Sequence, residues 1–210
     1  MVDEENNTEN ASDENKSDDG EQEVFDDENK LTQKFTLLDG EMEGEALVYD
    51  EAGWISEKAI YVKGELHGES IQYGQEDKIS EKVHYEKGIL EGKYERFDDD
   101  GKILEKGSFR KGKLDGESIS YEEGVVAQVA NYRDGQLNGE ITLFDNDEIT
   151  QKINFVEGKL EGPALSYENG QVRAKWAHKN GKQHGEYVVF GDHEKPISKS
   201  VYKDGKLEGE

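Results

Sequence analysis

The sequence has no cysteine, only two prolines and no long apolar run. The absence of cysteine excludes disulfides, thiolate zinc sites and cysteine nucleophiles together. We expect no membrane span, and the amino terminus lacks the basic and apolar regions of a signal peptide. A cytoplasmic location is therefore expected, with a nuclear location as the alternative, unless the chain is part of a longer protein.

Apolar side chains are also scarce. Hydrophobic residues make up 32% of the 210 residues, charged residues make up 36%, and the 24 glycines bury no side chain. This composition predicts a thin, elongated structure instead of a thick central core. The formal net charge of −24 repels phosphate backbones and anionic lipids, so we expect no nucleic acid and no anionic membrane as partner. The same charge favours a basic protein partner.

A short phrase, Gly-x-Leu-x-Gly, returns along most of the chain. Its first glycine is followed by the next after 24, 24, 24, 23, 23, 23 and 24 residues, at Gly40, Gly64, Gly88, Gly112, Gly135, Gly158, Gly181 and Gly205. A period of this length indicates an array of structural repeats that stack on their neighbours.

Within each repeat, apolar and polar residues alternate with a period of two. Ile119 and Tyr121 are predicted to point to one face and the neighbouring serines to the other. In the following strand, Ile149, Ile153 and Phe155 are predicted to share a face. The predicted fold is therefore all-β, with almost no helix: an elongated array of antiparallel β-hairpins in a single twisted or curved sheet, with about seven repeats of 23–24 residues.

The first thirty residues differ from the rest. They hold 13 Asp or Glu residues against Lys16 and Lys30, and few apolar residues. We predict an acidic disordered tail over residues 1–30, either a solvating segment or an interaction segment for a basic partner. The repeat array is predicted over residues 31–210, with an incomplete last repeat that begins at Gly205.

The pattern aromatic-x-x-Gly-x-Leu-x-Gly-Glu-x-x-x-aromatic, on a step of 23–24 residues, resembles the MORN-repeat variant family. The resemblance covers about residues 31–210, and His178, Gln183, Lys93 and Pro163 depart from the pattern. It implies an all-β array of hairpins used as a binding or spacer module. Bacterial members are commonly catalogued as YwqK-like antitoxins, and a similar array precedes the catalytic domain of some SET-domain lysine methyltransferases. No SET-type segment is present here, so the resemblance carries over no methyltransferase activity.

Few residues suggest chemistry. The five histidines are spread over the repeats, so we predict no metal site. The carboxylates recur as a row and not as a pair in a pocket, so we predict no catalytic residues, and no phosphate loop, cofactor site or small-molecule substrate is expected. The recurrent glutamates are expected to form a solvated face, and the aromatic rows either the core of the sheet or an exposed binding strip. This row consists of Glu45, Glu69, Glu117, Glu140 and Glu186.

We expect a non-enzymatic repeat scaffold that binds a partner protein, with an antitoxin-like role toward a basic partner as the concrete form. The predicted partner-binding residues are Trp54, which lies at a turn, and Glu69, Glu117, Glu140 and Glu186 of the recurrent row. Two alternatives stay open. The array could be the regulatory or substrate-positioning module of a larger enzyme of the SET-methyltransferase type, or a membrane-associated MORN module.

Overall fold

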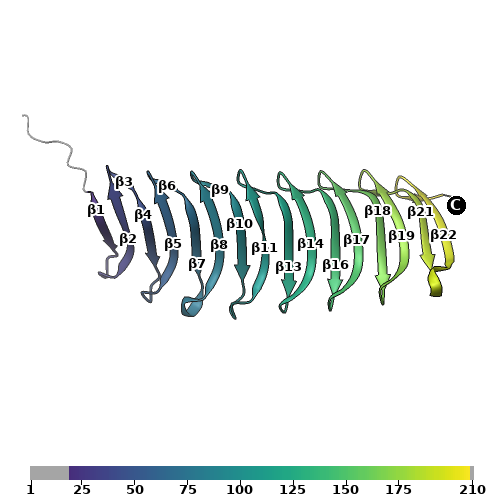
Figure 1. Ribbon diagram of the computed structural model, residues 1–210, viewed down its shortest axis with the longest axis horizontal. Coiled ribbons are helices and arrows are strands. Elements are labelled where there is room, and N and C mark those ends of the chain that lie inside the picture. Colours follow the sequence, from purple (N-terminus) through teal and green to yellow (C-terminus); the bar gives the residue numbers. More distant parts are fainter. Residues whose placement is uncertain (1–18, 209–210) are drawn as a thin grey trace, which may run out of the picture.

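The structure is a computed structural model that describes residues 19–208. It is a single antiparallel sheet of 23 strands, which confirms the all-β prediction (Figure 1). The other regular elements in these residues are two single-turn 3-10 segments, η1 (Gln75–Asp77) and η2 (Asp192–Glu194). None of the helical segments in residues 19–208 is long and apolar enough to cross a membrane.

The sheet consists of eight hairpins, each with a first and a second long strand. The first strands are β1 (Gly20–Phe25), β4 (Gly44–Tyr49), β7 (Gly68–Tyr73), β10 (Gly92–Phe97), β13 (Gly116–Glu122), β16 (Gly139–Asp145), β18 (Lys159–Glu168) and β21 (Gly185–Phe190). The second strands are β2 (Leu31–Leu38), β5 (Ile55–Val62), β8 (Ile79–Glu86), β11 (Ile103–Arg110), β14 (Val125–Arg133), β17 (Glu148–Val156), β19 (Gln171–Lys179) and β22 (Pro196–Lys203).

Short strands of two residues come from the Gly-x-Leu-x-Gly phrase. They are β3 (Glu41–Met42), β6 (Glu65–Leu66), β9 (Ile89–Leu90), β12 (Lys113–Leu114), β15 (Gln136–Leu137), β20 (Lys182–Gln183) and β23 (Lys206–Leu207). Every long strand between β1 and β22 pairs with the long strands before and after it, so the sheet is a simple meander along the length of the molecule (Figure 1). Each hairpin therefore contacts mainly its two neighbours, as in other repeat proteins.

The first glycine of the phrase occupies a tight turn between a second strand and the short strand that follows. In the turn after β5, Lys63 (φ 50°) and Gly64 (φ 74°) both adopt the left-handed conformation, as a type I′ turn requires. The backbone N–H of Gly64 donates to the carbonyl of Met42 in the preceding repeat at 2.9 Å, and the same bond recurs from Gly88 to Leu66 at 2.8 Å. The phrase therefore links each hairpin to the hairpin before it.

The turn at the opposite end of the hairpin explains why some repeats have 24 residues and others have 23. Five residues separate Phe97 from Ile103, and the Asp98 carboxylate closes this loop by accepting two backbone N–H bonds at 2.8 and 3.0 Å. The 23-residue repeats have a shorter turn instead, such as the one in which Asn169 (φ 51°) and Gly170 (φ 73°) are both left-handed. The extra residue thus lies in a loop and leaves the strands in phase.

The amino-terminal boundary differs from the prediction. Residues 20–25, predicted to be part of a disordered tail, form strand β1, which pairs with β2. The acidic residues that suggested disorder have a partner there, because the Lys34 ammonium lies 2.8 Å from Glu21 and 3.7 Å from Glu23. The sheet therefore begins at Gly20 and not at residue 31. Residues 1–18 of the predicted tail, and residues 209–210 of the incomplete repeat, lie outside the described residues.

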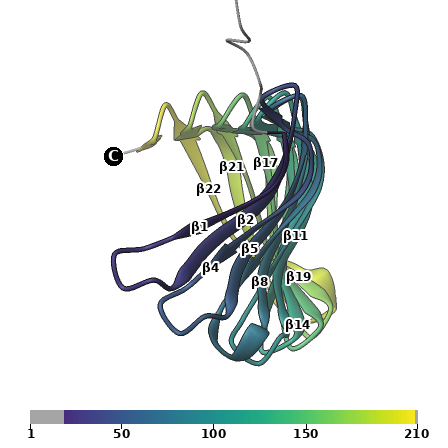
Figure 2. The same ribbon diagram turned by 90° about the vertical axis from the view of Figure 1, so that its left-hand side faces the viewer.

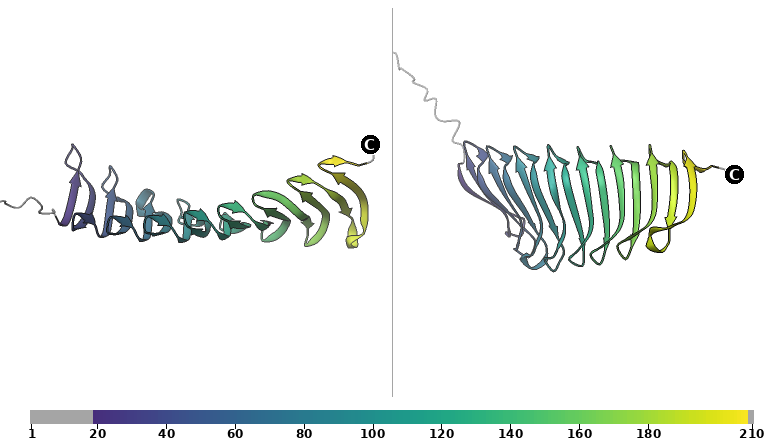
Figure 3. Two further views of the ribbon diagram at one scale, coloured as in Figure 1. Left: turned by 90° about the horizontal axis from the view of Figure 1, so that it is seen from above. Right: turned by 45° about the vertical axis from the view of Figure 1, so that its right-hand side comes forward.

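The two faces of the sheet have different side chains. Seen from its end, the sheet is curved in cross-section (Figure 2), and along its length it also twists (Figure 3). Nine of the ten buried residues in the described chain lie on one face, as expected on the inside of a curve; they are Ala46, Ala59, Ser70, Tyr94, Ser118, Ala130, Ile141, Ala164 and Ala174. We call this side the concave face, and the opposite side, which carries the recurrent glutamates, the convex face.

A register shift lies beside every turn opposite the phrase and changes which side chains share a face. In the hairpin β16–β17, Ile141 lies opposite Ile153, but the shift sets Phe144 opposite Ile149. Ile149 therefore lies on the convex face with Phe144, while Ile153 and Phe155 lie on the concave face. The predicted common face for Ile149, Ile153 and Phe155 is wrong, because the alternation was carried through a bulge.

Candidate functional site

Three of the five recurrent glutamates, Glu45, Glu140 and Glu186, are paired with lysines on the convex face. The Lys152 ammonium lies 2.9 Å from Glu140, and the Lys199 ammonium lies 2.6 Å from Glu186. This proximity lowers the pKa of Glu186. Two of the four glutamates predicted to bind a partner, Glu140 and Glu186, are therefore paired with a lysine of their own hairpin while they stay exposed to solvent. These pairs are exposed to solvent and screened by salt, so they contribute little to stability.

Glu69 and Glu117 differ from the other two. Both are exposed, and neither has an ion pair or a side-chain hydrogen bond in residues 19–208. For Glu117 the cause is visible in the sequence. Val129 occupies the position of the paired lysine, opposite Ile119, whereas the next hairpin has Lys152 there. Of the predicted glutamates, these two are the ones that keep an unpaired negative charge.

Trp54 lies in the loop between β4 and β5, and the residue is 55% exposed. Its backbone N–H donates to the Asp50 carboxylate at 2.9 Å, so the loop is fixed by its own backbone and does not depend on the indole. Glu69 begins a strand at the other end of the hairpins, next to the phrase. The structure therefore does not bring Trp54 and the recurrent glutamates together into one site.

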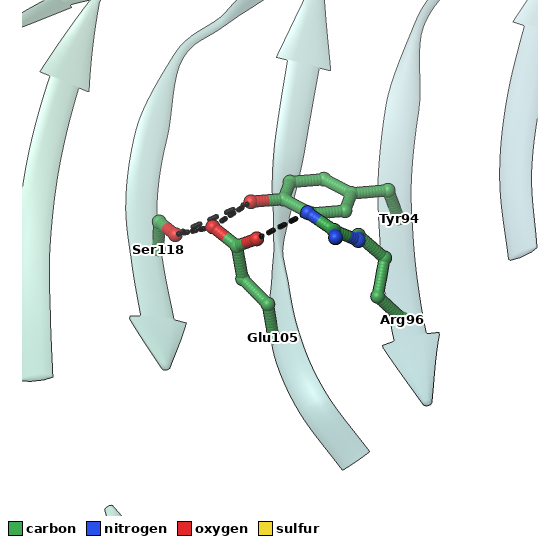
Figure 4. A network of polar contacts seen from close by, with 4 residues as sticks. All are labelled: Tyr94, Arg96, Glu105 and Ser118. Atoms are coloured by element: carbon green, nitrogen blue, oxygen red, sulfur yellow. Dashed lines mark hydrogen bonds and ion pairs between the residues drawn. The ribbon is translucent and has the colours of Figure 1, made fainter. Parts of the chain in front are cut away.

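The concave face holds a polar network that was not predicted (Figure 4). The Tyr94 hydroxyl donates to Glu105 Oε1 at 2.9 Å, and the Ser118 hydroxyl donates to the same oxygen at 3.2 Å. The Arg96 guanidinium lies 3.3 Å from Glu105 Oε2. Three neighbouring strands, β10, β11 and β13, supply these four residues, so the network joins two consecutive hairpins.

Tyr94 occupies a position where four sibling hairpins have alanine or serine, although Ile141 and Tyr187 occupy it in two others. Its ring fits because Gly107 lies opposite, and a Cβ added to Gly107 would come within 2.7 Å of the ring. The ring also contacts Phe109, with centroids 4.9 Å apart. Burial raises the pKa of Tyr94 to about 12; the Ser118 bond acts against this shift and the Glu105 bond adds to it. The phenol is therefore a proton donor at neutral pH.

A row of carboxylates crosses the amino-terminal half of the concave face. Glu57, Glu81 and Glu105 occupy the same position in three consecutive hairpins. Tyr61 and Tyr85 form a parallel row beside them. Burial is the main cause that raises the pKa of Tyr85, and the nearby Glu57 and Glu81 carboxylates add to the shift. Phenol rings and carboxylates therefore lie side by side along this half of the face.

The end of this half is hollowed. A depression of about 140 Å³ is lined by Phe35, Met42, Ala46, Val48, Glu57, Ala59 and Tyr61, together with Gln33 and Leu47. The facing residues Ala46 and Ala59 form its floor. Two hairpins farther along the sheet, Tyr94 and Gly107 occupy the equivalent positions. The sequence contains this signal, since the position that carries Glu57, Glu81 and Glu105 becomes glutamine at Gln128 and Gln151. The sequence prediction did not include this row, because it rested on the glutamates next to the second glycine of the phrase.

Nothing in this arrangement prepares a group for catalysis. Both oxygens of Glu105 are engaged by donors, and the Tyr94 phenol is held protonated. Among residues 19–208, no three histidine or acidic side chains converge closely enough to hold a metal ion. The concave face instead offers apolar rings beside negative charges, which is a combination that binds extended cationic chains.

Comparisons with known proteins give one family match. No curated protein matches the chain. Among solved structures, a mutant of S. aureus TarM in complex with fondaparinux, α-GlcNAc-glycerol and UDP is 13% identical, with a TM-score of 0.18; the match covers 62% of this chain and 21% of that one. This likeness is too slight to support any argument about fold or function. The model of the MORN repeat variant matches residues 42–63 and 90–111, so two of the eight hairpins, β4–β5 and β10–β11, are similar to that repeat in sequence.

Proposed function

We propose that the chain is a non-enzymatic repeat scaffold that binds a basic segment of a partner protein on its concave face. One observation carries the proposal: rings and carboxylates lie in parallel rows on a face that no second layer covers within residues 19–208. MORN repeats are interaction modules for proteins or membranes. The net charge of −24 favours a cationic protein segment over an anionic lipid surface.

The sequence leaves three more specific roles open for such a scaffold. An antitoxin-like role is a finer version of the same proposal and rests on the family resemblance. A module that positions a substrate for a larger enzyme would use the same concave face for the same kind of segment. A membrane-associated module instead predicts that the chain co-sediments with vesicles containing anionic lipids, and we expect no co-sedimentation at physiological salt.

The convex face is the competing location for the partner. Trp54, Glu69 and Glu117 are exposed there or at its margin, and their role as contacts stays a proposal. Glu140 and Glu186 are weaker candidates, since Lys152 and Lys199 neutralise them. A direct comparison of the two faces decides between these locations.

The experiment measures fluorescence anisotropy of a labelled lysine- and proline-rich peptide with two double variants. The variant E57Q/E81Q removes two charges from the concave face, and E69Q/E117Q removes two charges from the convex face. We expect the first to weaken binding about tenfold and the second less than about twofold, since only the first removes direct contacts. Unchanged circular dichroism shows that both variants fold. Equal losses, or a larger loss for E69Q/E117Q, would contradict the concave location.

A further inference from the structure

The concave face repeats its chemistry at a fixed distance. One hairpin contributes two strands, and neighbouring strands are about 4.8 Å apart, so equivalent residues recur about every 9.6 Å across the sheet. Glu57 and Glu81 are related by this step, and so are Tyr61 and Tyr85. A ligand that runs across the strands would meet the same pair, a carboxylate and a ring, once per hairpin.

The spacing selects among the conformations a bound segment can have. In a β-strand, side chains on one face recur about every 6.7 Å. This distance differs from the hairpin step of about 9.6 Å, so the second side chain of a bound strand would already miss the next hairpin. An α-helix advances about 5.4 Å per turn and also fails to match one step. A polyproline II helix has three residues per turn and rises about 3.1 Å per residue, so every third side chain recurs after about 9.3 Å. This repeat agrees with the hairpin step to within a few tenths of an ångström.

The surface between the rows suits such a segment. Polyproline II helices dock on grooves lined by aromatic rings, and the depression beside Phe35 and Tyr61 has a floor of two alanines. The exposed backbone of this helix leaves its charged side chains free to reach Glu57 and Glu81. Of these two carboxylates, only Glu57 has a hydrogen bond in the described part of the chain, a long one of 3.5 Å from Ser70.

The row has a defined end. In β10–β11, the third hairpin of the carboxylate row, Arg96 pairs with Glu105. The guanidinium therefore occupies the place where Glu105 would otherwise bind a basic side chain of the ligand. Tyr94 also fills the floor there, because its ring lies over Gly107. The next two hairpins have Gln128 and Gln151 in place of the carboxylate. The acidic track therefore stops at Arg96, which limits how many basic side chains it holds.

We propose that the concave face binds a polyproline II segment of a partner protein with Lys or Arg at every third position, in register with Glu57 and Glu81, and that Arg96 ends this register. The proposal rests on the proposed function, since it specifies the segment that the scaffold binds.

The test compares two labelled nonapeptides of identical composition, three lysines and six prolines. One has lysine at every third position, and the other has the three lysines together at one end. We expect the first to bind wild-type protein about tenfold more tightly in anisotropy titrations, because only its charges match the hairpin step. The variant E57Q/E81Q is expected to abolish this preference, whereas E69Q/E117Q keeps it.

A gain-of-function variant guards against loss of folding as an explanation. R96Q frees one oxygen of Glu105 for the third lysine, while Tyr94 and Ser118 still hold the other. We expect R96Q to bind the evenly spaced peptide about fivefold more tightly than wild type does, and to bind the clustered peptide with unchanged affinity.

The outcomes separate the two proposals. If both peptides bind equally and E57Q/E81Q weakens both, the concave face binds basic segments but the spacing inference is overturned. If neither peptide binds even at low salt, the proposed function on this face fails as well. If R96Q binds the evenly spaced peptide no better than wild type does, Arg96 does not end the register.

Discussion

At the scale of single residues, the pair Tyr94–Gly107 shows how one substitution is compensated within a repeat. The sibling hairpins place Ser118 opposite Ala130 and Ala46 opposite Ala59. Tyr94 adds a ring to this row, and Gly107 removes the methyl group that would collide with it. Gly107 has an ordinary extended backbone, so its role is space and not conformational freedom.

The pair makes a prediction about stability. Gly107→Ala is expected to destabilise the protein by about 1–3 kcal/mol, because the new Cβ would displace the ring of Tyr94. In a Tyr94→Ser background, the same change recreates the Ser118–Ala130 pair and is expected to be neutral. Urea unfolding of the four proteins in this cycle measures the coupling. Additive effects of the two substitutions would show that the ring does not depend on Gly107.

The buried phenol also predicts a response to pH. The folded-state pKa of Tyr94, about 12, lies above the value of about 10 expected in the unfolded chain, so folding favours the protonated phenol. Its contribution to stability is complete below pH of about 10 and is lost as pH rises through about 12. The unfolding midpoint in urea should therefore fall more steeply over this window for wild type than for Tyr94→Phe. Parallel curves for the two proteins would exclude a special titration of Tyr94.

At the scale of the element, each hairpin is held to the next through the residue before the second glycine of the phrase. The Glu91 carboxylate accepts the backbone N–H of Lys111 in the next turn at 2.8 Å. Glu43 accepts that of Lys63 at 2.8 Å, and Glu161 accepts that of Asn180 at 2.6 Å. The donor in each case is the left-handed residue of the type I′ turn, which has no strand partner. An acceptor side chain at this position therefore stabilises the following turn.

This bond can be tested with two substitutions, of which only Glu91→Gln keeps the size of the side chain. Glu91→Ala is expected to lower the free energy of unfolding by about 0.5–1.5 kcal/mol, since the N–H of Lys111 loses its acceptor. Glu91→Gln keeps an acceptor oxygen and should cost less than half of that loss. Chemical denaturation of both variants supplies the comparison. A similar loss for Gln and Ala would mean that the negative charge of Glu91, and not the hydrogen bond, stabilises the turn.

The hairpins could be predicted from the sequence because the pattern that specifies each one lies within a single repeat. The Gly-x-Leu-x-Gly phrase and the alternation around Ile119 were enough to predict the hairpins. Two features escaped because they depend on the partner strand. The bulge that moves Ile149 to the convex face follows from the register with β16, and strand β1 is stabilised by Lys34 on β2. The concave site was missed for the same reason, since Glu105 meets Tyr94 only across strands.

At the scale of the whole molecule, the array is nearly one-dimensional. Long strands pair only with their neighbours in sequence, and no distant segments interleave within residues 19–208. Stability should then be close to a sum of hairpin terms and neighbour terms. Removing one entire repeat should leave both faces and both kinds of turn in phase.

Deletion of residues 135–157 tests this property. It joins Asp134 to Gly158, which restores a left-handed residue followed by glycine at the turn, and the N–H of Gly158 can then take the bond that Gly135 makes to the Leu114 carbonyl. We expect a folded protein with a cooperative transition and an m-value in urea lower by roughly an eighth, because one of eight hairpins is lost. The control deletes residues 135–145, which removes one strand, so that every strand that follows runs in the opposite direction and its Gly-x-Leu-x-Gly turn lies at the other edge of the sheet. The control should lose cooperative unfolding, because the apolar concave rows on either side of the junction no longer meet. Equal behaviour of the two deletions would contradict a sheet in which each hairpin depends on the alignment of its rows with those of its neighbour.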